Sequence, residues 1–179
     1  RLVNGSEVSL NFPFTGNANY IDFNPKAQNS AVISKNDSLW ISKNIQDPIP
    51  TWSFIGAFNG NNIKSVAWSI KDTNRLYLIN SNSKVYRTDN LYTTTPVFNL
   101  FNTPSTTNTT ASIAVIAKND SIVYISCGNI IYRSNNAGNT WTNIKYNYPA
   151  VNVIRLYHDP YTSNESIYAV GSIAVYFKM

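Results

Sequence analysis

Short apolar runs separated by polar turns recur along the whole chain, and no stretch sustains the three-to-four-residue apolar spacing of an amphipathic helix. The runs are mostly three to seven residues long and rich in Val, Ile, Tyr, Phe and Trp. Asn, Ser, Asp, Gly and Pro lie between them. This pattern predicts β-strands joined by turns, so we expect an all-β fold.

The apolar runs form repeating units of four. The first runs are Tyr20 to Phe23, Ile63 to Trp68, Ile113 to Ile116 and Val151 to Tyr157, and the second are Ala31 to Ile33, Leu76 to Ile79, Ile122 to Ile125 and Ile167 to Val170. The third are Leu39 to Ile41, Lys84 to Tyr86, Ile130 to Tyr132 and Ile173 to Tyr176, and the fourth are Trp52 to Ile55, Val97 to Phe101 and Trp141 to Tyr146. Four strands in roughly 40 to 50 residues predict antiparallel β-propeller blades, about four in this chain.

A polar turn with a fixed step of 46 residues follows the third run of the first three units. Asn44, Asn90 and Asn136 are separated by this step, and each has a hydroxyl residue two positions earlier. The hydroxyl residues are Ser42, Thr88 and Ser134, and the aromatic residues four positions before each Asn are Trp40, Tyr86 and Tyr132. One register shared by three residue types indicates a structural repeat.

The best-preserved copy is Ser134-Asn135-Asn136-Ala137-Gly138-Asn139-Thr140-Trp141, which resembles the Asp-box (BNR) motif Ser-x-Asp-x-Gly-x-Thr-Trp with Asn in place of Asp. The second copy has no Gly, and the first carries an insertion before Thr51 and Trp52. Sialidases, sortilin-like receptors, xyloglucanases and photosystem assembly factors carry this motif. The resemblance implies a propeller of six or more blades, with the motif as a structural turn between the third and fourth strands.

The chemistry of the motif agrees with a structural role. An Asn side chain can accept backbone N–H bonds within a turn, Gly138 can supply a positive φ, and Trp141 can cover the hairpin. We therefore expect the motif residues to hold the blades together rather than bind a ligand. The predicted structural residues are Ser134, Asn136, Gly138, Thr140, Trp141, Thr88, Asn90, Ser42 and Asn44.

A single propeller segment is expected over residues 1–179. The predicted units are 17–59, 60–102, 103–148 and 149–179, the last of them incomplete. Glu7 to Phe14 is predicted to be the final strand of a blade, within residues 1–16. That strand either closes a small ring with the fourth unit or belongs to a blade upstream, and the resemblance favours a fragment of a larger propeller.

Composition favours a secreted or cell-surface protein. Only 13% of the residues are charged, Asn, Ser and Thr are abundant, and Cys127 is the single cysteine. No apolar run is long enough to predict a membrane span. The net charge is +5, but the 14 Lys and Arg residues are scattered, so no nucleic-acid partner is expected. Arg87 and Arg133 lie one period apart, where they either bind an anion or are solvated, and we favour the second reading.

Candidate catalytic chemistry is sparse. A glycosidase usually needs two facing carboxylates, and the chain has nine acidic residues, of which only Glu7 and Glu165 are Glu. Asp72, Asp120 and Asp159 precede the second runs of successive units, which assigns them to turns. There is no Cys/His cluster, no Gly-rich phosphate loop and no dense Asp repeat. We predict no catalytic, cofactor-binding or metal-binding residue; the sole His158 lies in a turn, and Asn102 to Thr110 is expected to be a loop.

Three functions remain open. The first is a non-catalytic propeller segment that binds a protein or a glycan, to which Trp68, Tyr92 and Tyr157 could contribute. The second is part of a glycoside hydrolase or sialidase-like enzyme whose catalytic residues lie largely outside this chain. The third is an architectural spacer in a large surface protein. Two carboxylates within reach of each other in a cleft would favour the enzyme.

Overall fold

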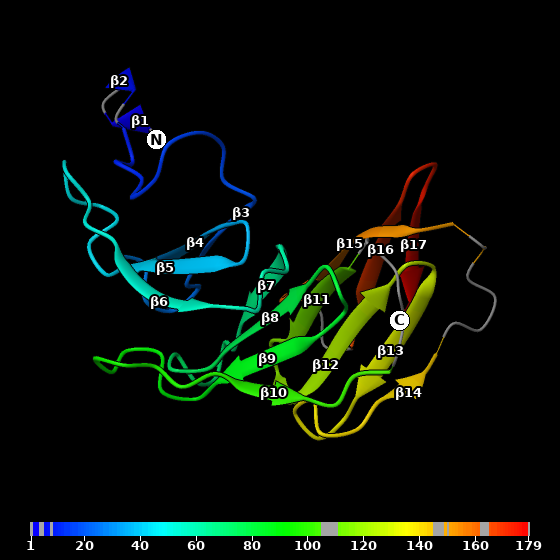
Figure 1. The fold of residues 1–179 in the computed structure, drawn as a ribbon. Coiled ribbons are helices and arrows are strands. Elements are labelled where there is room, and N and C mark those ends of the chain that lie inside the picture. The colour runs from blue at the N-terminus through cyan, green and yellow to red at the C-terminus, as the bar shows by residue number, and fades with distance from the viewer. Residues whose placement is uncertain are drawn as a thin grey trace.

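The computed structural model describes residues 2–3, 6–7, 9–104, 111–144, 149, 151–161 and 165–178. Within these residues every regular element is a β-strand, and four antiparallel sheets are arranged around a common centre (Figure 1). We call these sheets blades 1 to 4 in chain order. The all-β prediction is confirmed.

The blades have three or four strands each. Blade 1 contains β3 (Tyr20–Phe23), β4 (Ala31–Lys35), β5 (Ser38–Ser42) and β6 (Ser53–Ala57), and blade 2 contains β7 (Ile63–Trp68), β8 (Leu76–Asn80), β9 (Val85–Thr88) and β10 (Asn99–Phe101). Blade 3 contains β11 (Ala111–Ile116), β12 (Asn119–Cys127), β13 (Ile130–Ser134) and β14 (Thr142–Asn143), and blade 4 contains β15 (Val153–His158), β16 (Ile167–Gly171) and β17 (Val175–Lys178).

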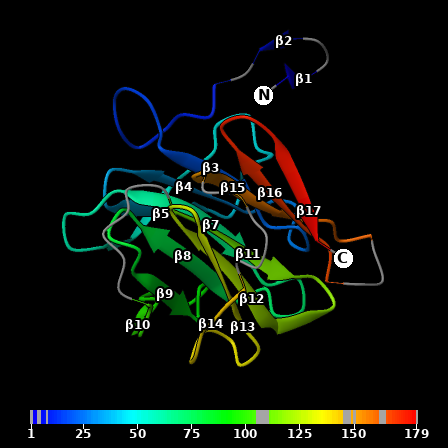
Figure 2. The same ribbon diagram turned by 90° about the vertical axis from the view of Figure 1, so that its right-hand side faces the viewer.

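The innermost strands β3, β7, β11 and β15 converge in the middle of the molecule (Figure 2). All residues of β8 and β11 are buried, because blades cover both faces of these strands. A strand covered on both faces appears in the sequence as a continuous apolar run rather than as an alternating one. This explains why the predicted runs are short and uniformly apolar.

Adjacent blades pack face to face, and each interface is an apolar cluster. Blades 1 and 2 meet at Leu39, Ile41, Trp68, Leu78 and Tyr86. Blades 2 and 3 meet at Tyr77, Ile79, Ile113, Ile125 and Tyr132, and blades 3 and 4 meet at Tyr124, Ile131, Leu156, Ile167 and Ala169. The repeating aromatic residues Tyr86 and Tyr132 therefore cover the preceding blade, which is how a repeat without its own closed core becomes stable.

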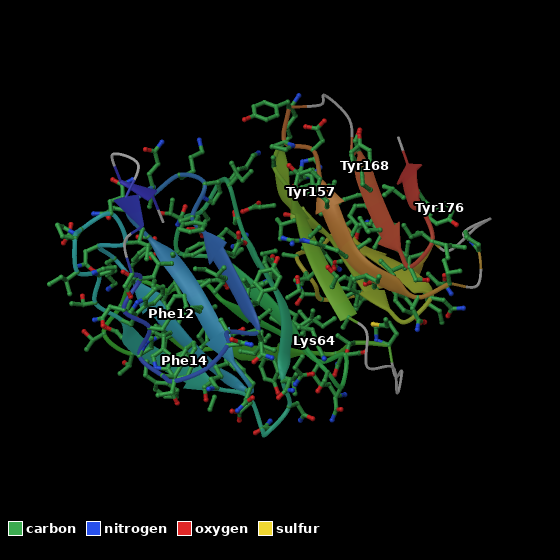
Figure 3. The ribbon with its side chains drawn as sticks, turned by 90° about the horizontal axis from the view of Figure 1, so that it is seen from above. Phe12, Phe14, Lys64, Tyr157, Tyr168 and Tyr176 are labelled. Atoms are coloured by element: carbon green, nitrogen blue, oxygen red, sulfur yellow. The ribbon has the colours of Figure 1, made fainter. Side chains whose placement is uncertain are left out.

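The predicted strand from Glu7 to Phe14 is wrong for residues 9–14, which form no strand. Among the described residues before blade 1, the one strand pair is β1 (Leu2–Val3) with β2 (Ser6–Glu7). Phe12 and Phe14 instead lie over blade 1, where the Phe14 ring is 5.0 Å from Trp40 (Figure 3). The apolar alternation that suggested a strand arises from these two rings, which pack on a sheet face without joining its edge.

Two other predicted segments lie partly outside the described residues. These are the loop from Asn102 to Thr110, described only to residue 104, and the fourth run of the third unit, described to residue 144. Within the latter, β14 covers only Thr142–Asn143.

Candidate functional site: a cavity between the inner strands

The three Asn turns share one hydrogen-bond pattern. In blade 3, the Ser134 hydroxyl donates to Asn136 Oδ1 at 2.9 Å, and the same oxygen accepts the backbone N–H of Thr140 at 2.9 Å. The backbone N–H of Gly138 donates to Ser134 Oγ at 2.9 Å, and Gly138 has a φ of 92°. The Asn side chain and the buried hydroxyl therefore bond to each other and close the turn.

The same bonds occur where the motif is degenerate. Thr88 donates to Asn90 Oδ1 at 2.8 Å and Ser42 to Asn44 Oδ1 at 3.2 Å. Asn90 Oδ1 accepts the N–H of Val97, and Asn44 Oδ1 accepts the N–H of Thr51, both at 2.9 Å. The Asn side chain thus closes a loop of four residues in blade 3 and of seven in blades 1 and 2. None of these Asn residues lines the cavity described below.

Arg87 and Arg133 are partly exposed, but both guanidinium groups are held by hydrogen bonds and ion pairs, so the interpretation that they are merely solvated is wrong. Arg133 Nε and Nη2 donate to the two carboxylate oxygens of Glu165 at 2.9 and 2.8 Å. The Tyr124 hydroxyl donates to the same carboxylate at 2.8 Å, and burial together with Glu165 raises the pKa of Tyr124 to about 12. This cluster joins blade 3 to the residues just before β16. The partners are 32 residues apart, which the 46-residue repeat does not indicate.

Arg87 joins blade 2 to blade 3. Its guanidinium donates to the carbonyl oxygen of Ala137, inside the blade 3 turn, at 2.7 Å and lies over the Phe101 ring. It also pairs with Asp89, which in turn pairs with Arg75. Arg75 reaches Asp120 of blade 3 at 2.9 Å. Both arginines of the series are therefore structural contacts between blades.

A cavity of about 220 Å³ lies between the four innermost strands. Its floor is apolar, with β7 and β11 contributing Val66, Ala67, Ile113 and neighbouring residues. Its polar and aromatic lining comes mainly from β3 and β15. These residues are Tyr20, Asp22, Trp68, Arg155, Tyr157 and His158.

Asp22 is the carboxylate of this cavity. Its Oδ1 accepts the backbone N–H of Phe23 at 3.0 Å. Burial raises the pKa of the Asp22 carboxyl to about 6, against the opposing effects of the Phe23 hydrogen bond and the nearby Arg155 charge. Asp22 therefore changes its charge near pH 6.

Arg155 and Tyr20 meet across the cavity. Arg155 Nη2 donates to the Tyr20 hydroxyl at 3.0 Å, and the guanidinium lies 5.4 Å from the centre of the Tyr20 ring. Burial and Asp22 raise the pKa of Tyr20, while Arg155 opposes the shift. Tyr20 therefore carries a proton at neutral pH and remains a neutral partner for the guanidinium.

Two ring nitrogen atoms, which belong to residues that line the cavity, have no hydrogen-bond partner. His158 Nδ1 is 3.0 Å from the carbonyl oxygen of Ser166, so Nδ1 carries the proton, and the buried Nε2 has no partner. Trp68 Nε1 is likewise buried without a partner. Tyr157 is 53% exposed, and its ring lies 6.4 Å from that of Tyr168 (Figure 3). Tyr157 therefore gives the cavity an exposed aromatic wall, while these two ring nitrogens lie buried behind its surface.

Sequence reasoning named Trp68 and Tyr157 but missed Tyr20, Asp22 and Arg155. Tyr92, also named, does not line the cavity; its hydroxyl accepts a hydrogen bond from Asn24 Nδ2 at 3.0 Å. Tyr20 and Arg155 are 135 residues apart, and neither belongs to a motif. The signal that could have found Arg155 is its place in the repeat, where the inner strands of blades 2 and 3 carry serine.

Of the acidic residues that the structure describes, Asp22 alone lines the cavity. The described part of the chain contains no group of three or more His, Cys, Asp or Glu residues that could hold a metal ion. In that same part, no helix has the length and apolar character needed to cross a membrane.

No family model and no curated protein matches the chain. Solved structures do resemble it. YCF48 from Cyanidioschyzon merolae is 16% identical with a TM-score of 0.68, covering 92% of this chain and 51% of its own. A YCF48 bound to D1 peptide is 13% identical with a TM-score of 0.66, covering 90% and 49%.

A GH74 xyloglucanase from Xanthomonas campestris is also similar, with 12% identity and a TM-score of 0.68 over 89% of this chain and 27% of its own. The chain therefore spans about half the length of the first two structures and about a quarter of the third. At these identities the likeness shows the fold. The prediction of β-propeller blades is confirmed.

Proposed function

We propose that this chain is a non-catalytic β-propeller segment that binds another protein, through a peptide segment seated in the cavity between its inner strands. The observation that carries this proposal is the cavity lining. An apolar floor lies beneath Tyr20, Trp68 and Tyr157, with the charged Asp22 and Arg155 among them. Concave apolar sites with a few polar groups are typical of ligand binding.

The similar YCF48 structure with a bound D1 peptide supports a peptide as the occupant. Tyr157 is well placed for such a contact because it both lines the cavity and is exposed. Aromatic rings give large contact areas at a low cost in side-chain entropy. A glycan is the runner-up ligand, since it also stacks on aromatic rings.

The enzyme alternative is a glycoside hydrolase segment whose catalytic residues lie largely outside this chain. The likeness to GH74 enzymes favours it, as two of the similar structures belong to that group. The cavity lining disfavours it, because glycosidases usually place two carboxylates across the sugar, and Asp22 is the one carboxylate that the described residues place here.

We further propose that the segment belongs to a larger propeller in a secreted or cell-surface protein. Exposed apolar residues on the two end blades support the larger propeller, with Phe54 on blade 1 and Val175 on blade 4 more than half exposed. The low content of charged residues supports export. Cell fractionation of the source organism, with detection by an antibody, would test the location.

A comparative binding panel tests the main proposal. The immobilised chain is offered a random-sequence peptide library and a glycan array, and hydrolysis of aryl glycosides is measured in parallel. We expect peptide binding that Tyr157→Ala weakens at least tenfold. Tyr161→Ala is the matched control, because Tyr161 is 94% exposed and lies outside the cavity.

Each alternative has its own result in this panel. Glycan binding that depends on Tyr157 would replace the peptide with a sugar. Turnover of a glycoside would establish the enzyme. Peptide binding that is equally sensitive to Tyr157→Ala and Tyr161→Ala would contradict the cavity as the binding site.

A further inference from the structure

We propose that Arg155 anchors a carboxylate of the bound peptide, and that the Tyr20 hydroxyl holds the guanidinium in place until the ligand arrives. This inference rests on the proposed function, peptide binding in the inner-strand cavity. It adds the chemistry by which a ligand is chosen: an acidic group must enter the cavity beside Tyr20.

Arg155 differs from the other described arginines in its pairing. Arg75, Arg87 and Arg133 each form an ion pair with an Asp or Glu. Among the described residues Arg155 forms no ion pair, and its partner is the neutral hydroxyl of Tyr20. A guanidinium has five N–H donors in a planar fork that matches a carboxylate. Arg155 therefore keeps donors for a ligand that the other three have already used.

Arg155 also differs from the residues at the equivalent position in blades 2 and 3. Ser65 pairs with Ile79 in blade 2, and Ser112 pairs with Ser126 in blade 3. Arg155 pairs with Val170 at the same place in blade 4. The two serines accept backbone N–H groups of the next inner strand, from Ile113 and Leu156. Arg155 makes no such bond, so a structural serine has been replaced by an exposed cation.

The surroundings of the Arg155 guanidinium leave it available to a ligand. The strands β7 and β11 contribute only apolar residues and Trp68 to the lining, so no titratable group faces Arg155 from them. From β3 it faces Tyr20 and Asp22, and β15 itself adds Tyr157 and His158. Among the described residues, Asp22 is the one acid of the lining that could compete, and it does not reach ion-pairing distance. A charge-assisted bond beside apolar walls is stronger than one in open water.

The carboxylate can come from a peptide C-terminus or from an Asp or Glu side chain. Three N-acetylated tetrapeptides separate these sources. The first is Ala-Tyr-Ala-Val with a free C-terminus, the second is the same sequence as its amide, and the third is Ala-Tyr-Glu-Val as its amide. All three share the aromatic residue, and the first two differ only in the C-terminal carboxylate.

The readout is the nitrogen NMR signal of each arginine side chain during titration with each peptide. We expect a saturable shift of the Arg155 Nε signal with the first or third peptide and none with the amide of the first. The Nε signals of Arg75, Arg87 and Arg133 serve as internal controls and should not move. Tyr20→Phe should tighten binding at least twofold, because it removes the competing hydroxyl and keeps the ring.

Arg155→Ser, which restores the residue that the inner strands of blades 2 and 3 carry, should abolish the preference for a carboxylate. Equal affinity for acid and amide, or an Arg155 signal that is silent with all three peptides, would overturn the anchor. The proposed function is judged separately by the peptide library, so it can stand if the anchor fails. An unchanged backbone amide spectrum away from the cavity shows that each variant remains folded.

Discussion

Arg155 and Tyr20 occupy the same register position on the innermost strands of blades 4 and 1, and Arg155 Nη2 donates to the Tyr20 hydroxyl at 3.0 Å. Ser65 and Ser112 hold this position in blades 2 and 3 and bond to the neighbouring blade. The same repeat position therefore has two uses. In blades 2 and 3 its serine bonds to the neighbouring blade, and in blades 4 and 1 Arg155 and Tyr20 contact each other across the cavity.

Arg133 and Arg155 are predicted to contribute unequally to the stability of the fold. Arg133→Ala removes a two-pronged bond to Glu165, and we expect it to lower the free energy of unfolding by about 1 to 2 kcal/mol, a range reduced for partial exposure. Arg155→Ser removes one bond to a neutral hydroxyl at an exposed position and should cost less than about 1 kcal/mol. Urea unfolding of both variants measures the difference. A larger loss for Arg155→Ser would mean that its contact with Tyr20 holds the blades together.

The cavity carboxyl predicts a specific pH dependence of stability. The pKa of Asp22 is raised from 3.8 to about 6, so the folded chain binds a proton more tightly than the unfolded chain. The contribution of Asp22 to the free energy of unfolding is therefore fully present below about pH 4 and is lost as the pH rises through about 6. For a two-unit pKa shift this contribution is at most about 3 kcal/mol. Asp89, whose pKa is lowered beside Arg75 and Arg87, acts in the opposite direction.

The Asp22→Asn variant isolates the contribution of this group. Its free energy of unfolding should exceed that of the original chain increasingly between pH 4 and pH 7, because the amide never becomes charged. Urea unfolding of both proteins across this range gives the difference curve. A flat difference curve would show that Asp22 titrates normally in the folded chain.

The Asn turns predict a tolerated and a damaging substitution at the same position. Asn136→Ala removes the acceptor of both Ser134 and Thr140 and leaves a buried hydroxyl without it, so a loss of about 1 to 2 kcal/mol is expected. Asn136→Asp keeps the acceptor oxygen and should stay within about 0.5 kcal/mol of the original. Thermal and urea unfolding test both variants. Equal losses would show that the Nδ2 bond to Thr140 Oγ1 matters as much as the acceptor.

The elements of this fold were predictable because each strand is a local apolar run, whereas the cavity was not. Strands β3 and β7 begin and end where their apolar runs do. Tyr20, Asp22 and Arg155 lie on strands at opposite ends of the chain, and no sequence motif connects them. Phe12 and Phe14 misled the prediction for a related reason: a run of apolar residues shows that a segment is covered, but not whether it joins a sheet edge or lies on a face.

The blade 3 turn offers a matched pair of backbone substitutions next to each other. Gly138 has a φ of 92° and Ala137 a φ of 56°, both in the region that favours glycine. Gly138→Ala should cost about 1 to 2 kcal/mol, and it would bring a methyl group within 3.6 Å of Phe101 and Trp141, an ordinary contact, so the backbone rather than crowding sets the loss. Ala137→Gly should be neutral or stabilising by up to about 1 kcal/mol, because the relief of a left-handed alanine is partly offset by the greater freedom of unfolded glycine. Urea unfolding of the two variants gives changes of opposite sign if this reasoning holds, and a stabilising Gly138→Ala would show that the turn does not hold residue 138 at a positive φ.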